Sequence, residues 1–191
     1  DPSAIRASVL RHLDHPLPQP NPQLRGHGHY IAALVALARD ESPDADLVAM
    51  EAVYEAMSSQ HPRILLVRVV SDFLLLRLRW DVSRGMVDPA LFDRAVALYS
   101  SEFALDSSYP PGFHRLAEVH ALRAAWRLSQ GEDPSQDIAD GLVRAGEALA
   151  RDPRMPPALA TRGSLELLAA RTAKTAEARE ASAQQAVKSL T

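Results

Sequence analysis

The sequence predicts an all-α protein, a right-handed solenoid of about four helical hairpins with a leading N-terminal helix. Three residues with the i, i+3, i+7 spacing of one helix face recur four times, at offsets of 45, 46 and 45 residues. These trios are Leu47, Met50, Tyr54; Phe92, Ala95, Tyr99; Ile138, Gly141, Ala145; and Ala183, Ala186, Leu190. A second set, offset by 45, 45 and 46 residues, is Ile31, Leu76, Ala121 and Leu167. We therefore expect two helices per repeat, with both sets of residues buried between neighbouring helices.

Composition agrees with helical packing. Hydrophobic residues make up 47% of the chain and aromatic residues only 5%, which favours close-packed helices over a sheet. Most of the 14 prolines and 8 glycines fall in short clusters that separate helical stretches. The net charge of -3 gives no broad attraction to nucleic acid or to anionic lipid, so neither is predicted as a partner.

Proline, glycine and polar clusters divide the 191 residues into one helical-repeat domain with successive elements. An amphipathic helix is expected over residues 2–13, through Ile5, Val9 and Leu13, and a proline-rich linker continues to residue 23. The hairpins are expected at about 24–60, 63–106, 110–151 and 156–191. Their helices are predicted at 24–39, 45–59, 63–80, 90–105, 110–129, 137–150, 158–171 and 176–190.

Several classes of protein are disfavoured by simple features. The absence of cysteine excludes disulfides and thiolate metal sites. The longest apolar run, residues 64–78, is too short and too charged to cross a bilayer, so no membrane insertion is expected. No signal peptide is evident and the chain begins with Asp1, so we interpret it as a cytoplasmic segment of a larger protein.

Repeat length and internal spacing point to different solenoid families. A period of 45 residues is typical of HEAT or armadillo arrays, whereas tetratricopeptide repeats have about 34 residues. In the tetratricopeptide pattern, the small residue of a second helix and that of the next first helix are 22 positions apart. Gly141 and Gly163 have this spacing, and so do Ala95 and Ala117. Pro153 occupies the position of the closing proline. This spacing favours tetratricopeptide-like hairpins, with the surplus of 11 or 12 residues in long loops between the two helices of each hairpin.

A narrower resemblance covers residues 85–190. It is carried by Gly131-Glu132-Asp133-Pro134, by RAGEALARDP at 144–153 and by PALATRGS at 157–164. These stretches resemble the repeat region found C-terminal to the kinase domain in bacterial serine/threonine protein kinases. The resemblance implies a tetratricopeptide-like fold and a regulatory role in such a kinase.

The chain departs from that family pattern at two positions, and it lacks the kinase's own machinery. Asp72 stands where a small residue is expected, and Ser107 where a proline is expected. There is no Gly-rich phosphate loop, no His-Arg-Asp segment and no Asp-Phe-Gly segment. We therefore expect this segment not to be an enzyme, although its parent is expected to be a kinase.

Histidines are the first candidates for a ligand site, because four of the seven lie within the first 29 residues. His12 and His15 are three residues apart, and His27 and His29 are two apart. Neutral imidazoles bind metals, but Asp14 is the only carboxylate close to them in the sequence. A metal site and a solvated or capping role are both open, and we predict the second, with no metal and no cofactor.

His114 and Glu118 form a second candidate pair. They are four residues apart on one helix face, at positions that line the groove of tetratricopeptide arrays. The pair could hold a metal or act as a His–carboxylate couple, and the simpler interpretation is a surface pair in the groove. Where related domains clamp a peptide carboxylate with Lys and Asn, this chain has His114 and Glu118, or Ala160 and Ser164, so that mode is not expected.

A polar stripe follows the helix predicted at residues 63–80. At about 100° per residue, Arg68, Asp72 and Arg79 lie within about 40° of one another. One interpretation is an internal Arg68–Asp72 pair with an exposed Arg79 at the rim. The other has the guanidinium groups facing the groove to bind carboxylates or phosphates. The candidate partner groove thus contains Arg68, Asp72, Arg79, His114 and Glu118.

These features favour a non-catalytic protein-interaction or regulatory scaffold region of a bacterial signalling protein, a serine/threonine protein kinase being the expected parent. A partner helix or extended peptide would dock on a rigid curved surface. The alternatives are a small-ligand sensor that regulates an attached catalytic domain, and a homo-oligomerisation element. An open groove would favour the protein partner, an enclosed cavity the sensor, and a concentration-dependent mass the oligomer.

Overall fold

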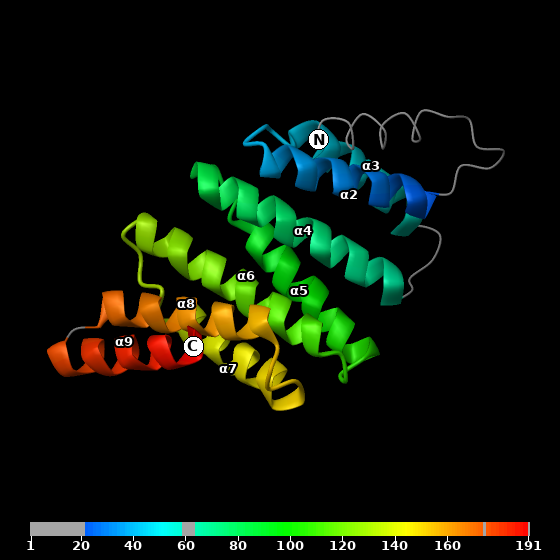
Figure 1. Ribbon diagram of the computed structural model, residues 1–191. Helices are drawn as coiled ribbons and strands as arrows, with labels where there is room; N and C mark the ends of the chain where they lie inside the picture. The colour runs from blue at the N-terminus through cyan, green and yellow to red at the C-terminus, as the bar shows by residue number, and fades with distance from the viewer. Residues whose placement is uncertain (1–21, 59–63, 174, 191) are drawn as a thin grey trace. The chain divides into compact units, whose positions relative to one another are not determined.

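The described part of the chain is entirely helical, which confirms the all-α class. The computed structural model describes residues 22–58, 64–173 and 175–190, and every element in these ranges is a helix (Figure 1). The helices are α2 (Pro22–Ala38), α3 (Asp44–Ser58), α4 (Ile64–Arg84), α5 (Ala90–Leu105), α6 (Pro110–Ser129), α7 (Ser135–Arg151), α8 (Pro156–Thr172) and α9 (Ala176–Leu190). The helix expected at residues 2–13 lies outside the described residues.

Helix boundaries follow the prediction within two residues, except at the end of α4. This helix continues four residues past its predicted end at Trp80. Asp81 stays helical because its carboxylate accepts a hydrogen bond from Arg77 Nε at 2.7 Å, and the Ser83 hydroxyl donates to the Trp80 carbonyl at 2.7 Å. The helix stops only before Gly85, whose φ of 69° is the left-handed conformation that glycine favours.

The expectation of long loops within the hairpins is wrong. The α2–α3, α4–α5 and α6–α7 connections are residues 39–43, 85–89 and 130–134, each five residues long. The surplus over a tetratricopeptide repeat instead lengthens the helices, of which α4 has 21 residues and α6 has 20. Short connections of this kind are typical of antiparallel helix pairs.

The repeat appears in the turns that end the first helices of the hairpins. Asp40, Gly85 and Gly131 have positive φ angles of 56°, 69° and 76°, and they are 45 and 46 residues apart. After each of them, the next backbone N–H donates to the carbonyl five residues earlier, at 2.9–3.0 Å. This is the Schellman arrangement, which satisfies the last carbonyls of a helix.

The turns that follow show the same period. Side-chain oxygens of Ser42, Asp88 and Asp133 accept hydrogen bonds from the backbone N–H two residues later, at 3.2, 3.0 and 2.9 Å. Asp106 and Asp152, 46 residues apart, do the same after α5 and α7. Such side-chain turns favour the chain reversal between two helices. The sequence repeat is therefore also a repeat of local structure.

Helix packing is arranged around α6. Backbone contacts divide the chain into two compact units, residues 1–73 and 74–191, with the boundary inside α4. In the first unit α2 packs on α3. In the second, α6 packs on α5, α7 and α8, and α8 packs on α7 and α9 (Figure 1). Within the described residues α4 and α5 pack less closely than the other hairpin pairs.

Three of the four predicted core trios are confirmed, whereas the second set of repeat positions is not a core stripe. Every member of the first three trios is buried, and so is Ala186 in the fourth. In the second set only Leu76 is buried, while Ile31 and Leu167 are 37% and 45% exposed. Leu165 and Leu167 point about 200° apart around α8. The contact that buries Leu165 therefore leaves Leu167 exposed.

Gly141 lies where α7 approaches both α6 and α8. A Cβ atom on Gly141 would lie 2.9 Å from both terminal methyl groups of Leu165 on α8 and 3.2 Å from Cβ of His120 on α6. Leu165 is fully buried and has little room to move. Gly146, five residues later in α7, has nothing within 4 Å of the same position.

These two glycines give a matched pair of substitutions. We expect Gly141→Ala to lower the free energy of unfolding by about 1–3 kcal/mol, because overpacking outweighs the better helix propensity of alanine. Gly146→Ala should raise it by up to about 1 kcal/mol, because only the propensity changes. Urea denaturation followed by circular dichroism measures both, and equal effects of the two changes would contradict the packing assignment.

Candidate functional site

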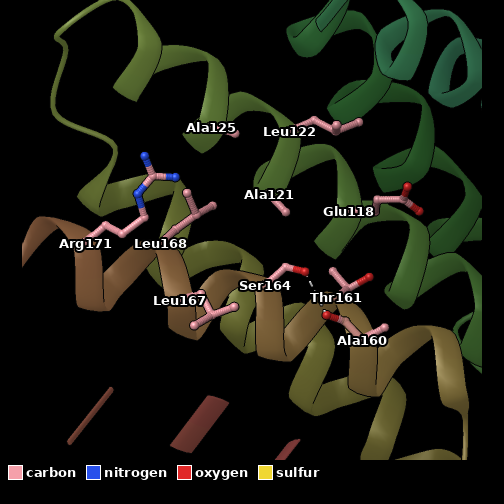
Figure 2. A pocket seen from close by; sticks show the side chains of 10 residues that line it. All are labelled: Glu118, Ala121, Leu122, Ala125, Ala160, Thr161, Ser164, Leu167, Leu168 and Arg171. Atoms are coloured by element: carbon pink, nitrogen blue, oxygen red, sulfur yellow. Dashed lines mark hydrogen bonds between the residues drawn. The ribbon is translucent and has the colours of Figure 1, made fainter. Parts of the chain in front are cut away.

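An open groove lies between α6 and α8, with a volume of about 440 Å³ (Figure 2). It is open to solvent along its length rather than enclosed. Its lining residues are Glu118, Ala121, Leu122 and Ala125 from α6, and Ala160, Thr161, Ser164, Leu167, Leu168 and Arg171 from α8. Figure 2 shows Glu118 and Arg171 at opposite ends, with the leucines and alanines between them.

The packing of α7 determines where this groove lies. His120 of α6 and Leu165 of α8 both face Gly141 of α7. On α6, Ala121 and Ala125 lie about 100–150° around the helix from His120, and hence on another side of it. The small alanine side chains on these faces leave space between the two helices. The groove is thus the outer side of the same three-helix contact that buries Gly141.

At one end of the groove, Glu118 of α6 forms an ion pair with Arg79 of α4. Arg79 Nε and Nη2 donate to the two carboxylate oxygens of Glu118 at 2.5 and 2.7 Å, a bidentate arrangement. The predicted exposure of Arg79 is confirmed, since 46% of its side chain is accessible. Glu118 is therefore already neutralised by a cation of this chain.

His114 is buried, so the prediction of a surface histidine is wrong. Its Nε2 lies 3.2 Å from Thr161 Oγ1 and 3.9 Å from Glu118 Oε2, between α6 and α8. Burial lowers the pKa of His114 and outweighs the opposite effect of Glu118. In a serine-protease-like triad the carboxylate contacts the nitrogen that does not face the hydroxyl. Here both partners approach Nε2, and no such relay is formed.

The structure brings together Arg79, His114 and Glu118 of the predicted site. Arg68 and Asp72 are half-buried and belong to the unit of residues 1–73. There, burial and the negative charges of Asp72 and then Tyr30 raise the pKa of Tyr54 to about 12. The Arg68–Asp72 pairing itself stays a prediction.

Arg171 at the other end of the groove was missed by sequence reasoning. It is exposed in the last turn of α8 and forms no ion pair within the part of the chain that the structure describes. Leu122, Leu167 and Leu168 were missed as groove residues too. The repeat itself contains the signal, because Ala121 and Leu167 occupy equivalent positions, but their helical spacing is also the spacing that predicts core residues.

A second cluster of charged residues surrounds Asp137 at the start of α7. Asp137 is only 1% exposed. Arg123 Nε donates to its Oδ1 at 2.5 Å, Arg127 Nη1 lies 3.2 Å from its Oδ2, and His120 Nδ1 lies 3.3 Å from its Oδ1. Burial raises the pKa of Asp137. Hydrogen bonds from His120 and Arg123, together with the charges of Arg123 and Arg127, lower it by more, so the net shift of the pKa is downward. The cluster joins α6 to α7 and does not line the groove.

A similar histidine–aspartate contact occurs two repeats earlier. His29 Nδ1 on α2 lies 3.1 Å from Asp46 Oδ1 on α3. Both members of this pair precede His120 and Asp137 by 91 residues, which is two repeat lengths. These pairs link the first and second helices of a hairpin. This explains His29 as a structural residue.

The described residues offer no cluster of three or more His, Cys, Asp or Glu that could hold a metal ion. His27 is exposed, with its ring 6.2 Å from that of Tyr30. His12 and His15 lie outside the described residues, so their predicted role is untested. Among the described helices, none combines the length and the apolar character that crossing a bilayer requires.

Comparison with known proteins does not assign this chain to a family. A scan against family models, a search of curated proteins and a search of solved structures each found no match.

The Asp137 cluster predicts a specific loss of stability. We expect Asp137→Asn to lower the free energy of unfolding at about pH 7 by about 2–3 kcal/mol, because Arg123 and Arg127 lose a buried counter-charge. The control Asp93→Asn, at a residue whose side chain is 84% exposed and which also contacts Arg123, should cost less than about 1 kcal/mol.

The same cluster predicts a dependence on pH. Folding lowers the pKa of Asp137 from an unfolded value of about 3.9, so its contribution is present above that pH and is lost as pH falls through the lower folded value. Urea denaturation of parent and Asp137→Asn at neutral and at acidic pH should show the difference between them shrinking. A constant difference would contradict the ionised role of Asp137.

Proposed function

We propose that this chain is a non-catalytic protein-recognition region and that the α6/α8 groove holds a segment of a partner protein. The observation that carries this proposal is an open, largely apolar groove in which Leu167 is 45% exposed. Exposed apolar surface that is gathered in a groove, rather than scattered, is typical of an interaction site. The open form favours a protein segment over a small sensor ligand, which would be buried in a more enclosed cavity.

We also propose that the hairpins form a right-handed, tetratricopeptide-like solenoid. Two features support it: the buried trios and the turn motifs at Asp40, Gly85 and Gly131 share one period, and small residues mark the contact of α7 with α6 and α8. In such arrays, the first helices of successive hairpins line the binding surface. Helices α6 and α8 are the first helices of two successive hairpins.

The setting of this region is proposed from the resemblance quoted above. The stretches at 131–134, 144–153 and 157–164 suggest the regulatory part of a bacterial serine/threonine protein kinase, located in the cytoplasm. A substrate or regulator protein that binds in the groove would then be held close to the catalytic domain of the kinase. Homo-oligomerisation is the alternative, and the mass of the protein in solution distinguishes the two.

Binding is tested by a charge placed in the groove. A library of displayed helical peptides selected on the parent protein should yield binders with dissociation constants of about 1–100 μM. Leu167→Glu should weaken the binding of these peptides at least about tenfold, because it puts a charge among the apolar side chains that line the groove. Val143→Glu is the control, since Val143 is 59% exposed on α7 and does not line the groove. Equal effects of the two variants would contradict the groove as the site.

We further expect no catalytic turnover from this chain. His114 is buried beside the groove and contacts Thr161 and Glu118 through the same nitrogen, so it does not form the triad in which a carboxylate and a hydroxyl lie on opposite nitrogens. Assays with activated esters, phosphate esters and ATP should give the same background rate for the parent, His114→Ala and Glu118→Ala. A rate that the parent shows and both variants lose would overturn this expectation.

A further inference from the structure

The shape and chemistry of the groove narrow the class of partner. Addition of an extended strand needs an exposed sheet edge, and the described residues are all helical. Recognition of a polyproline segment needs a groove lined by aromatic rings, and none of the lining residues is aromatic. An aliphatic groove between two helices is the setting in which an amphipathic helix docks.

The dimensions of the groove set the length of that helix. Along α8 the lining extends from Ala160 to Arg171, which at the rise of an α-helix is about 16 Å. A partner helix of about three turns covers this distance. Its apolar anchors at i, i+3 or i+4, and i+7 would lie over Leu122, Leu167 and Leu168.

Charge differs between the two ends of the groove. At one end the carboxylate of Glu118 is paired with Arg79 in a bidentate arrangement, so its charge is already neutralised. At the other end Arg171 is exposed and forms no ion pair within the described residues. Figure 2 shows its guanidinium group beside Leu168 at the edge of the groove. A guanidinium next to an apolar surface is a suitable partner for a carboxylate.

We propose that the groove binds an amphipathic helix of a partner protein, with an aliphatic face on Leu122, Leu167 and Leu168 and an acidic side chain at one end paired with Arg171. This rests on the proposed function and adds the form, the charge and the orientation of the ligand. The single charged contact places the acidic end of the partner helix at the C-terminal end of α8. A basic end would face the same guanidinium and be repelled.

The test uses a displayed library of amphipathic helices of about 15 residues, with leucine at the apolar positions and random residues at both ends. Selection on the parent protein should enrich Asp or Glu at one end. Selection on Arg171→Glu should enrich Lys or Arg at that end instead. Arg179→Glu, an equal change of charge at an exposed residue of α9, should select the same peptides as the parent.

Measured affinities complete the test. For the best acidic peptide, Arg171→Glu should raise the dissociation constant by about tenfold or more, and Arg179→Glu by less than about twofold. If selection on the parent and selection on Arg171→Glu enriched the same residues at the ends of the peptides, this inference would be overturned. If those peptides still depended on Leu167, the proposed function would stand.

Two other outcomes would decide whether the groove binds a partner protein at all. Peptides that bind the parent and Leu167→Glu equally well, or no enrichment at all, would overturn both the inference and the proposed function. A mass of the unliganded parent that rises with concentration, and that falls to the monomer in Leu167→Glu, would show that a second copy of this chain fills the groove. In that case the inference is wrong.

Discussion

The contact among α6, α7 and α8 is the constraint on which the groove depends. Gly141 lets α7 approach both neighbours, because a Cβ atom there would lie 2.9 Å from Leu165 and 3.2 Å from His120. With α7 held on that side, the remaining faces of α6 and α8 are left to form the lining. A change that separates these helices would therefore alter the width of the groove as well as the stability of the protein.

Charged residues serve two different purposes in this structure. Around Asp137, a buried carboxylate is surrounded by His120, Arg123 and Arg127, so that desolvation is compensated inside the protein. In the groove, Glu118 is compensated by Arg79 while Arg171 is not compensated within the described residues. The charges around Asp137 and at Glu118 are thus compensated by the chain itself, and the docking that we propose would compensate Arg171 through an acidic side chain of the partner.

The repeat period could be predicted from the sequence because it depends on interactions between residues that are close in the chain. Left-handed turns at Gly85 and Gly131 and side-chain turns at Asp88 and Asp133 depend on neighbours within a few residues. The helix limits followed from the same signals. The end of α4 is the exception, because the helix continues to Arg84 through the contacts of Asp81 and Ser83, and this shortens the α4–α5 connection.

Sequence alone determined the all-helical class, the repeat, most helix limits and the first three buried trios, since each depends on periodicity or on nearby residues. Tertiary structure decided which face of each first helix is buried. Leu167 and Ala121 have the same repeat spacing as core residues, yet they line an open groove because α7 occupies another side of α6 and α8. It also decided the partners of charged residues distant in sequence: Arg79 and Glu118 are 39 residues apart and become a pair only when α4 reaches α6.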